Sequence, residues 1–337
     1  MQIRPQKLKY VFIFFTYIGF KKLINFLLLF FIKSFRFLPT VRFKHLGPAF
    51  ISVEPADFCQ LECPECPVGM LKKKKGKFLD HSMYYKAIDE LYESLFHVIF
   101  YFQGEPLLNP NLHEYILYAH NKRIFTSTST NGMMLTNENA RKLVLSGLDK
   151  LIVSVDGASQ EVYEQYRVGG KLQKVLDGIG YVQKWKKEFK SITPFVELQF
   201  IVFGTNEHEI VKIKKLAKVL VVDRLVLKSA QIYNFEKPSR FHTTISRYSR
   251  YKLAKDGKYK LKHCTPNSCF RAWSGAVLNV NANVLPCCYD KHSDYSFGNL
   301  AEASFITIWR NEKASKFRKG ILQNRKQYEM CRNCTSK

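Results

Sequence analysis

The stretch that decides the fold of this 337-residue chain is Asp57-Phe58-Cys59-Gln60-Leu61-Glu62-Cys63-Pro64-Glu65-Cys66-Pro67. Its three cysteines follow the spacing C-x3-C-x2-C. Three thiolates on one tight loop can bind three irons of a cubic 4Fe–4S cluster and leave the fourth iron open to a small molecule. Because a closed structural metal site takes four protein ligands, a set of three indicates chemistry at the metal.

Outward from this stretch, residues 48–228 alternate between segments with the pattern of buried strands and segments with the pattern of amphipathic helices. The predicted strands are 49–53, 98–102, 124–129, 151–155, 195–202 and 224–228. The predicted helices are 82–95, 112–120, 137–145, 159–166, 171–189 and 207–219. Because alternating βα units form parallel sheets, the pattern predicts an α/β domain over residues 48–228.

Residues suited to chemistry follow the predicted strands at the points where the strands end. After the first four strands come, in order, Cys59/Cys63/Cys66, Gly104-Glu105-Pro106, Asn131 and Asp156. In parallel α/β sheets, sites form from the loops at the carboxyl ends of the strands. We therefore expect these residues to belong to one site.

The nine cysteines occur in close groups, which in a chain of this length indicate metal sites rather than a disulfide framework. This favours a reducing, cytoplasmic environment. Residues 229–262 are polar, basic and aromatic without a clear period, and we interpret them as a linker or insert. Residues 263–337 hold the other six cysteines and a predicted hairpin at 276–285.

The formal net charge of +25 first suggests nucleic-acid binding, but its distribution argues against that partner. Residues 1–50 contain nine Lys or Arg and no Asp or Glu, and apolar runs at 10–20 and 23–32 separate them. On a helix of about 100° per residue, six of these cations fall within an arc of about 120°. They are Arg4, Lys7, Lys21, Lys22, Lys33 and Arg36. We therefore predict that residues 1–47 form an amphipathic helix that lies on the inner face of the cell membrane.

Two other interpretations of this segment stay open, a membrane span or hairpin and a buried core helix. Each apolar run alone is shorter than the roughly 20 residues of a span. A span through both runs would place Lys21 and Lys22 in the membrane, at roughly 2.5–3.5 kcal/mol each. A cleaved signal peptide is disfavoured, because no small-residue cleavage site follows.

Over residues 49–228 the chain resembles the radical SAM superfamily in strand order as well as in its cysteines. Cys59, Cys63 and Cys66 match the cluster motif of that family. Gln103-Gly104-Glu105-Pro106 is similar to its Gly-Gly-Glu-Pro motif, with Gln for the first Gly. The resemblance implies a partial (β/α)6 TIM-like barrel that binds a 4Fe–4S cluster and S-adenosylmethionine (SAM). It also implies cleavage of SAM to a 5′-deoxyadenosyl radical, which takes a hydrogen atom from the substrate.

The same resemblance implies which residues contact the amino end of SAM. The carbonyls near Gly104 and Pro106 and the Glu105 carboxylate would accept hydrogen bonds from the cationic amino group. Pro106 lacks an N–H and fixes its own φ, which shapes this loop. Asn131 would reach the methionine or the ribose.

Ser154 and Arg167, in the segment similar to the family's fourth-strand region, would hold the methionine carboxylate. An alternative for Arg167 is a surface ion pair with Glu161 or Glu164. The catalytic acid or base stays unassigned. The candidates, chosen by position alone, are Tyr101, His113, Asp156 and Glu197.

The C-terminal part resembles the SPASM or twitch extension of the superfamily, through features such as Trp273, Trp309 and a terminal C-x2-C. The resemblance implies one auxiliary 4Fe–4S cluster on four cysteines, Cys269, Cys287, Cys331 and Cys334. Cys288 is an alternative to Cys287, and Cys264 is left over. A zinc ion on the same four thiolates is the competing interpretation.

The sequence therefore predicts a radical SAM enzyme that oxidises its substrate and passes an electron to the auxiliary cluster. Its reductant would be a flavodoxin or ferredoxin, and its substrate a small molecule, a lipid-linked molecule or a peptide. The first alternative is a radical SAM peptide or protein maturase. The second is a non-catalytic iron–sulfur or zinc scaffold at the membrane.

Overall fold

The computed structural model describes residues 15–34, 46–263 and 266–335, and the chain forms two compact units that interleave along the sequence. Unit 1 contains residues 58–75 and the described residues from 128 onward to 263. Unit 2 contains the described residues up to 57, residues 76–127 and residues 266–335. The cysteine-rich C-terminal part therefore shares its unit with the first two strands of the predicted α/β domain.

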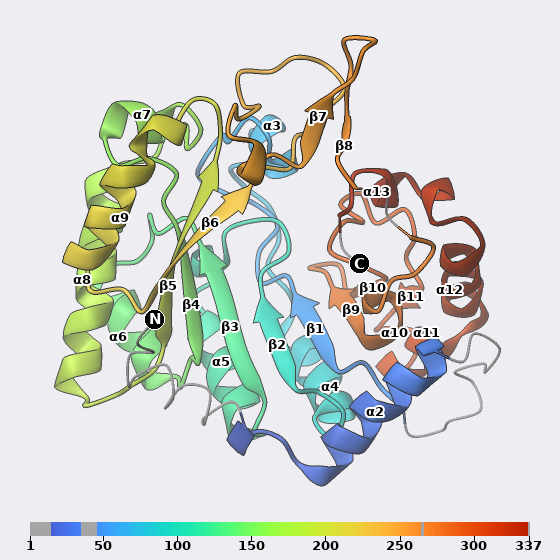
Figure 1. Ribbon diagram of the computed structural model, residues 1–337. Coiled ribbons are helices and arrows are strands. Elements are labelled where there is room, and N and C mark those ends of the chain that lie inside the picture. The colour runs from blue at the N-terminus through green and yellow to red at the C-terminus, as the bar shows by residue number, and fades with distance from the viewer. Residues whose placement is uncertain (1–14, 35–45, 264–265, 336–337) are drawn as a thin grey trace. The chain divides into compact units, whose positions relative to one another are not determined.

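Unit 1 has three parallel strands, β4 (Lys150–Ser154), β5 (Phe195–Val202) and β6 (Arg224–Ser229), paired in that order. The helices that precede and connect them, drawn in green and yellow in Figure 1, are α6 (Asn137–Leu145), α7 (Gln160–Glu164), α8 (Leu172–Glu188) and α9 (Ile210–Val219). The strands are rich in Val, Ile, Leu and Phe because a parallel sheet is covered on its faces. The predicted alternation is confirmed, with boundaries that differ by a few residues.

Unit 2 has the strand order β11-β10-β9-β1-β2, and β9, β1 and β2 run parallel. The strands are β1 (Phe50–Val53), β2 (His97–Phe100), β9 (Gly275–Leu278), β10 (Asn283–Leu285) and β11 (Gly298–Asn299). The predicted hairpin is therefore present as β9–β10. Its pairing with β1 was not expected, because β9 follows β1 by more than 200 residues. β3 (Phe125–Thr130) continues along the chain from unit 2 into unit 1.

The helices of unit 2 cover these strands. They are α2 (Phe20–Ser34), α4 (His81–Leu91), α5 (Leu112–Asn121), α10 (Arg271–Ser274), α11 (Phe305–Arg310), α12 (Glu312–Asn324) and α13 (Glu329–Arg332). α4 begins at Asp80, whose carboxylate accepts hydrogen bonds from the N–H groups of Ser82 and Met83. This satisfies two donors that the first helical turn leaves unpaired. The α/β class with a mostly parallel sheet is confirmed.

Residues 229–262, for which the sequence shows no period, are ordered in unit 1. They contain β7 (Tyr251–Leu253) and β8 (Tyr259–Leu261), which pair antiparallel. The ring of Tyr251 stacks on Phe235, with centroids 4.9 Å apart, and its hydroxyl accepts a hydrogen bond from the N–H of Ile232. Aromatic side chains therefore fix a segment whose sequence pattern does not predict structure.

The N-terminal helix differs from the predicted basic stripe. α2 begins at Phe20, after a break at Ile18 and Gly19, and Lys22 on it is buried. Lys22 donates to the carbonyl of Arg123, and burial lowers the pKa of its ammonium to about 8. Lys22 therefore does not belong to a solvent-facing basic surface. Arg4, Lys7 and Arg36 lie outside the described residues. In the part of the chain that the structure covers, no helix is both long and apolar enough to cross a membrane.

The largest fully buried side chain among the described residues is Trp309 on α11. Its Nε1 donates to the carbonyl of Gly275 at 3.3 Å, and the guanidinium of Arg318 lies 4.4 Å from the ring centroid. Arg318 in turn donates to the carbonyls of Ala272 and Trp309, at 2.8 and 2.9 Å. One aromatic ring thus joins α11, α12 and the start of β9.

We predict that Trp309→Ala lowers the free energy of unfolding by about 3–5 kcal/mol, because it opens a cavity and leaves Arg318 without its ring. Chemical denaturation of the reconstituted protein measures the change. Trp185→Ala, at a half-buried tryptophan on α8, is the matched control and should cost clearly less. Equal losses for the two variants would contradict the assignment.

Candidate functional site

The cysteine loop of unit 1 is held by a single turn of helix, α3 (Pro67–Met70), which begins directly after Cys66. The backbone N–H of Cys66 donates to the carbonyl of Cys63 at 3.2 Å. Gly69 lies so close that a Cβ on it would come within 2.5 Å of the backbone N and O of Cys63. Only glycine therefore fits where α3 crosses the loop.

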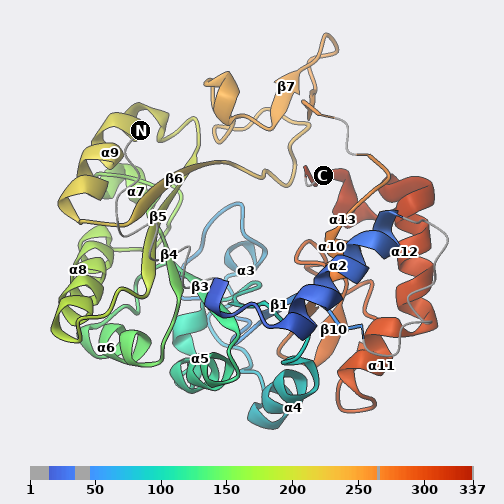
Figure 2. The same ribbon diagram turned by 60° about the horizontal axis from the view of Figure 1, so that its bottom comes forward.

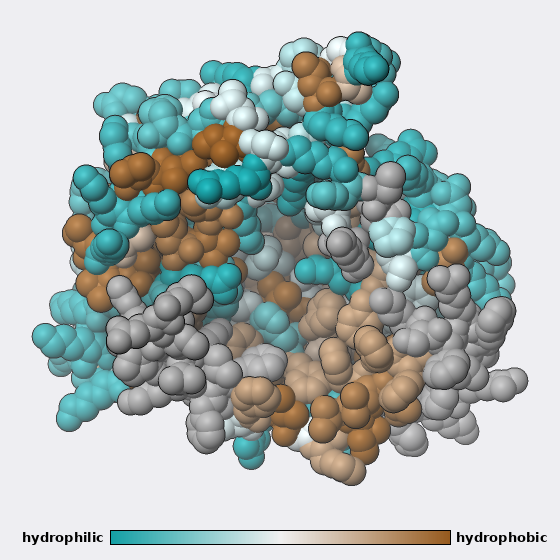
Figure 3. Space-filling view, in the orientation of Figure 1, coloured by the Kyte–Doolittle hydropathy of each residue, from teal (hydrophilic) through white to brown (hydrophobic). Residues whose placement is uncertain are grey.

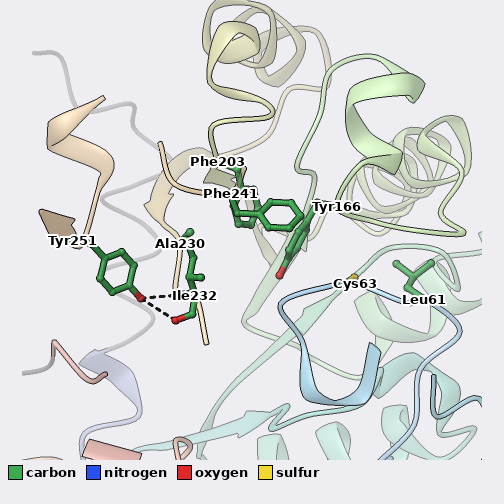
Figure 4. Packing of buried hydrophobic residues seen from close by; sticks show 8 residues of the cluster. All are labelled: Leu61, Cys63, Tyr166, Phe203, Ala230, Ile232, Phe241 and Tyr251. Carbon is green, nitrogen blue, oxygen red and sulfur yellow. Dashed lines mark hydrogen bonds between the residues drawn. The ribbon is translucent and has the colours of Figure 1, made fainter. Parts of the chain in front are cut away.

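The loop is closed off from solvent on one side by an aromatic cluster, shown in Figure 4. Tyr166, Phe203 and Phe241 contact one another, with ring centroids 4.3–5.8 Å apart. Cys63 and Leu61 belong to the same buried cluster, and Cys59 and Cys66 pack against it. Burial raises the pKa of the Cys63 thiol to about 11, and nearby Arg167 opposes the rise. A buried thiol of this kind loses its proton when it binds iron.

Asn131, after β3, contacts the cysteine loop through its side chain. Its Nδ2 donates to the Sγ of Cys59 at 3.4 Å. Its Oδ1 accepts from the Nε2 of Gln60 at 3.2 Å and from the N–H of Met133 at 2.9 Å. Asn131 therefore orients Cys59, which adds to the role predicted for it. Gln60 was not predicted as a site residue. Its role depends on its hydrogen bond to Asn131, which the sequence alone does not reveal.

Arg167 forms a buried ion pair with Asp156, at the end of β4. Its Nε and Nη2 lie 2.7 and 2.5 Å from Oδ2 of Asp156, and Oδ1 accepts from the N–H of Ile201 at 2.7 Å. Burial alone would lower the pKa of Arg167, but the charges of Asp156 and Cys63 hold it above its ordinary value. Arg167 therefore pairs with the buried Asp156 rather than forming the surface ion pair with Glu161 or Glu164 that was the alternative.

The Nη1 of Arg167 lies 4.0 Å from the Sγ of Cys63, so the guanidinium joins the end of β4 to the cysteine loop. Ser154, the last residue of β4, is buried and pairs with Gln199 of β5 in the sheet. Within unit 1 the structure thus brings together the cysteines, Asn131 and Asp156, three of the four groups expected at the strand ends, and Arg167 joins Asp156 to Cys63.

In unit 2, Gly104-Glu105-Pro106 follows β2 and leads into a 3₁₀ turn, Pro106–Leu108. Glu105 is buried, and its Oε1 accepts from the N–H of Leu107 at 3.1 Å. Gln103, the residue that replaces glycine in the motif, donates from Nε2 to the carbonyl of Lys291 at 2.8 Å. Lys291 Nζ donates back to the carbonyl of Phe102 at 3.0 Å. The substitution therefore ties this loop to the segment that follows Cys287 and Cys288.

Four thiols of unit 2 line one cavity, and they are the four predicted from the C-terminal resemblance. They come from three segments: Cys269 before α10, Cys287 after β10, and Cys331 and Cys334 at α13. Cys288 lines a neighbouring cavity instead and packs against Phe102, Val277 and Leu285. The geometry favours Cys287 over Cys288. Cys264 lies outside the described residues.

Two arginines accompany these thiols. Arg325 is buried, and its Nη2 donates to the Sγ of Cys334 at 3.1 Å while its Nη1 donates to the carbonyl of Ser268 at 3.0 Å. Arg271 lines the same cavity, and its Nη1 lies 3.6 Å from the Sγ of the neighbouring Cys288. Thiolates in this cavity would therefore be neutralised by guanidinium groups. Sequence reasoning missed Arg325, because nothing in its neighbourhood along the chain marks it.

Within residues 15–34, 46–263 and 266–335, no three Cys, His, Asp or Glu side chains converge closely enough to bind one metal ion.

Comparison with known proteins agrees with these two sulfur sites. The family model of the radical SAM superfamily matches residues 53–217, and that of the SPASM iron–sulfur cluster-binding domain matches residues 269–335. The chain is 30% identical over 317 residues to the "AdoMet-dependent heme synthase" of Methanosarcina barkeri, which covers 81% of this chain and 84% of that protein. The chain belongs to the radical SAM superfamily.

Other relatives act on different molecules. The "Tungsten-containing aldehyde ferredoxin oxidoreductase cofactor-modifying protein" of Pyrococcus furiosus is 24% identical over 85% of this chain and 87% of its own length. The "PqqA peptide cyclase" of Bradyrhizobium diazoefficiens is 24% identical over 85% of this chain and 78% of its own. The structure "Native anSMEcpe with bound AdoMet" superposes with a TM-score of 0.61 at 16% identity, over 85% of this chain and 88% of that one.

This membership implies a 4Fe–4S cluster and SAM for the radical SAM domain and auxiliary iron–sulfur chemistry for the SPASM domain. Enzymes of this superfamily use a reductant and a substrate. The relatives differ in what they modify, so membership does not choose a substrate.

The candidate acids and bases lie in different settings. Asp156 is bound to Arg167. Glu197 lies near the start of β5 and pairs with Lys150 at 3.0 Å, away from the carboxyl ends of the strands. His113, on the first turn of α5, lies 3.8 Å from Glu114. Tyr101 directly follows β2.

We predict that Asp156→Asn lowers the free energy of unfolding by about 3–5 kcal/mol, because it leaves the buried Arg167 without its counter-charge. Urea denaturation measures this loss. Asp177→Asn, at an exposed position on α8, is the control and should change stability by less than about 0.5 kcal/mol. An Asp156→Asn protein as stable as the control would show that the pair is not structural.

We also predict that Arg325→Gln lowers the reduction potential of the auxiliary cluster, on the order of 50 mV, because a cation and a sulfur hydrogen bond are lost. EPR-monitored redox titration of the reconstituted protein gives the potential. Arg332→Gln, at an exposed arginine next to Cys331, is the matched control. An unchanged potential in Arg325→Gln with full iron content would refute the prediction.

Proposed function

We propose that this protein is a radical SAM oxidoreductase that abstracts hydrogen from its substrate and passes one electron to an auxiliary cluster. The observation that carries the proposal is the pair of separate sulfur sites. One is a loop with three thiols, and the other is a cavity with four. In this assignment Cys59, Cys63 and Cys66 bind the first cluster, and Cys269, Cys287, Cys331 and Cys334 bind the second.

The first cluster and SAM together supply a 5′-deoxyadenosyl radical when they are bound. The protein's own part is to hold SAM and keep water away. Glu105 and the carbonyls near Gly104 and Pro106 receive the amino group, which suits a buried carboxylate. The aromatic cluster of Tyr166, Phe203 and Phe241 shields the cysteine loop from solvent.

Arg167 receives the methionine carboxylate in this proposal, together with Ser154. Its Nε and Nη2 hold Asp156, while Nη1 is turned toward Cys63. A carboxylate beside the iron that lacks a cysteine would therefore meet the Nη1 side. Asn131 fixes Cys59 and borders the same space, where the methionine or ribose would lie.

The four-thiol cavity supports the oxidative outcome. Four cysteines saturate a 4Fe–4S cluster, which then exchanges electrons and does not bind the substrate. Arg325 and the nearby Arg271 favour the reduced, more negative state of such a cluster, which suits an electron acceptor. The electron for SAM cleavage comes from a reductant of the flavodoxin or ferredoxin class.

A peptide or protein substrate is the second candidate, and the relationship to a peptide cyclase favours it. In that case the same residues hold SAM, and only the substrate differs. A non-catalytic scaffold is disfavoured, because the loop keeps all three cysteines together with Arg167 and Asn131 around it.

Closure of the α/β domain as a partial six-stranded barrel belongs to the same proposal.

Anaerobic reconstitution tests the function. We expect about eight irons and eight sulfides per chain, and 5′-deoxyadenosine after reduction in the presence of SAM. Cys63→Ala should abolish SAM cleavage. Cys331→Ala should lose about four irons and still cleave SAM, because it affects only the second site.

Near-stoichiometric zinc with no 5′-deoxyadenosine would reject the proposal. Loss of SAM cleavage in Cys331→Ala at unchanged iron content would reject the division into two independent sites. Substrate identity is decided by comparing metabolites and modified peptides between a deletion strain and its parent.

We further propose that the enzyme is cytoplasmic and works at the inner face of the membrane. The nine cations of residues 1–50, without a single Asp or Glu, support this location. A lipid-linked substrate would then be within reach, although attachment also serves to place the enzyme beside a membrane-bound partner.

A further inference from the structure

α2 carries an exposed apolar stripe. Phe20, Leu23, Ile24, Leu27 and Phe31 are exposed by 78, 41, 40, 45 and 53%, respectively. Their spacing of three and four residues places them on one side of the helix. Figure 3 shows apolar side chains gathered over the region that α2 occupies in Figure 1. Large contiguous apolar surfaces of this kind mark interaction sites.

The opposite side of α2 is bound to the protein by polar contacts. Asn25 exchanges two hydrogen bonds with the backbone of Gly47, both 3.1 Å long. Lys22 Nζ donates to the carbonyl of Arg123 at 2.5 Å, and Leu29 and Ile32 are fully buried on the same side. These contacts fix the rotation of the helix about its axis, so the apolar stripe has to face outward.

α2 thus differs from an ordinary surface helix, which exposes its polar side. Its inner side carries Lys22 and Asn25 beside the apolar Leu29 and Ile32, and its outer side carries the apolar stripe. Turning the apolar side inward would remove the buried partners of Lys22 and Asn25. In the part of the chain that the structure describes, no segment covers the stripe, whose five side chains are 40–78% exposed. An apolar surface of this size is costly in water unless something covers it.

The charge of the surrounding sequence identifies the partner. Residues 1–50 carry nine cations and no anion, and seven of these cations remain when Lys21, which pairs with Glu93, and the buried Lys22 are set aside. Cytoplasmic leaflets are anionic and attract such segments, and apolar side chains enter the boundary of the acyl chains. We propose that the stripe Phe20, Leu23, Ile24, Leu27 and Phe31 docks on an anionic phospholipid bilayer, with α2 parallel to its surface.

The docking of α2 is independent of the proposed function, because it needs neither a cluster nor SAM. Only the purpose of the docking, to bring the enzyme to its substrate or partner, rests on that function. It replaces the predicted basic stripe by an apolar one. Lys21 pairs with Glu93 at 2.5 Å, and Lys22 is buried, so neither carries the attraction.

Vesicle co-sedimentation of the reconstituted full-length protein tests the docking. The wild type should bind vesicles containing phosphatidylglycerol at least tenfold more tightly than vesicles of phosphatidylcholine alone. Leu23→Glu with Leu27→Glu should weaken that binding by about tenfold or more. Leu117→Glu with Leu145→Glu is the matched control, since those leucines are exposed by 43 and 50% and the charge change is the same.

Binding that is equal for the two double variants, or a wild type that stays in solution with anionic vesicles, would overturn the proposal. A wild-type dimer that only the α2 variant dissociates, without vesicle binding, would assign the stripe to a second copy of the chain instead. Cleavage of SAM by the α2 variant, measured in parallel, separates this outcome from failure of the proposed function.

Discussion

The buried ion pair between Asp156 and Arg167 is the contact on which the organisation of unit 1 depends. Through its side chain and its carbonyl, Asp156 joins the ends of β4 and β5, with Ile201 and Asn206 as partners. Arg167 carries the connection on to Cys63. A buried carboxylate is tolerated because a cation and a backbone N–H satisfy it. The ion pair thus fixes the thiol loop relative to the sheet. A purely apolar contact would fix it less well, because hydrophobic contacts are not directional.

The two sulfur sites use the same electrostatic arrangement from different parts of the fold. Each has a buried arginine near a cysteine sulfur, Arg167 beside Cys63 and Arg325 beside Cys334. Burial raises the pKa of Cys63 and of Cys331 to about 11, so these thiols resist ionisation without a metal. The guanidinium groups offset part of that cost once thiolates form. Clusters bound there would sit in a buried but positively charged surrounding, which favours electron uptake.

Much of this arrangement follows from the sequence, and the rest has identifiable reasons. The strands and helices were predictable because the periodic spacing of apolar residues shows which side of each segment is buried. The pairing of β9 with β1 is not predictable in that way, since it joins residues distant in the chain. The contact of Gln103 with Lys291 and the place of Arg325 beside Cys334 were not predicted for the same reason, because these partners meet only in the folded state. The ligand roles of the cysteines remain predictions from the motif.

The N-terminal helix shows where periodicity is ambiguous. A hydrophobic stripe tells which residues share one side of a helix, but not whether that side faces the protein or an external phase. In α2 two polar residues, Lys22 and Asn25, determine which side faces the protein. Their hydrogen-bond partners are backbone carbonyls of Arg123 and Gly47 in unit 2. An unsatisfied buried amide or ammonium costs more than exposing apolar surface that a bilayer can cover. The same residues that break the apolar run in the sequence therefore determine which side of the helix faces outward.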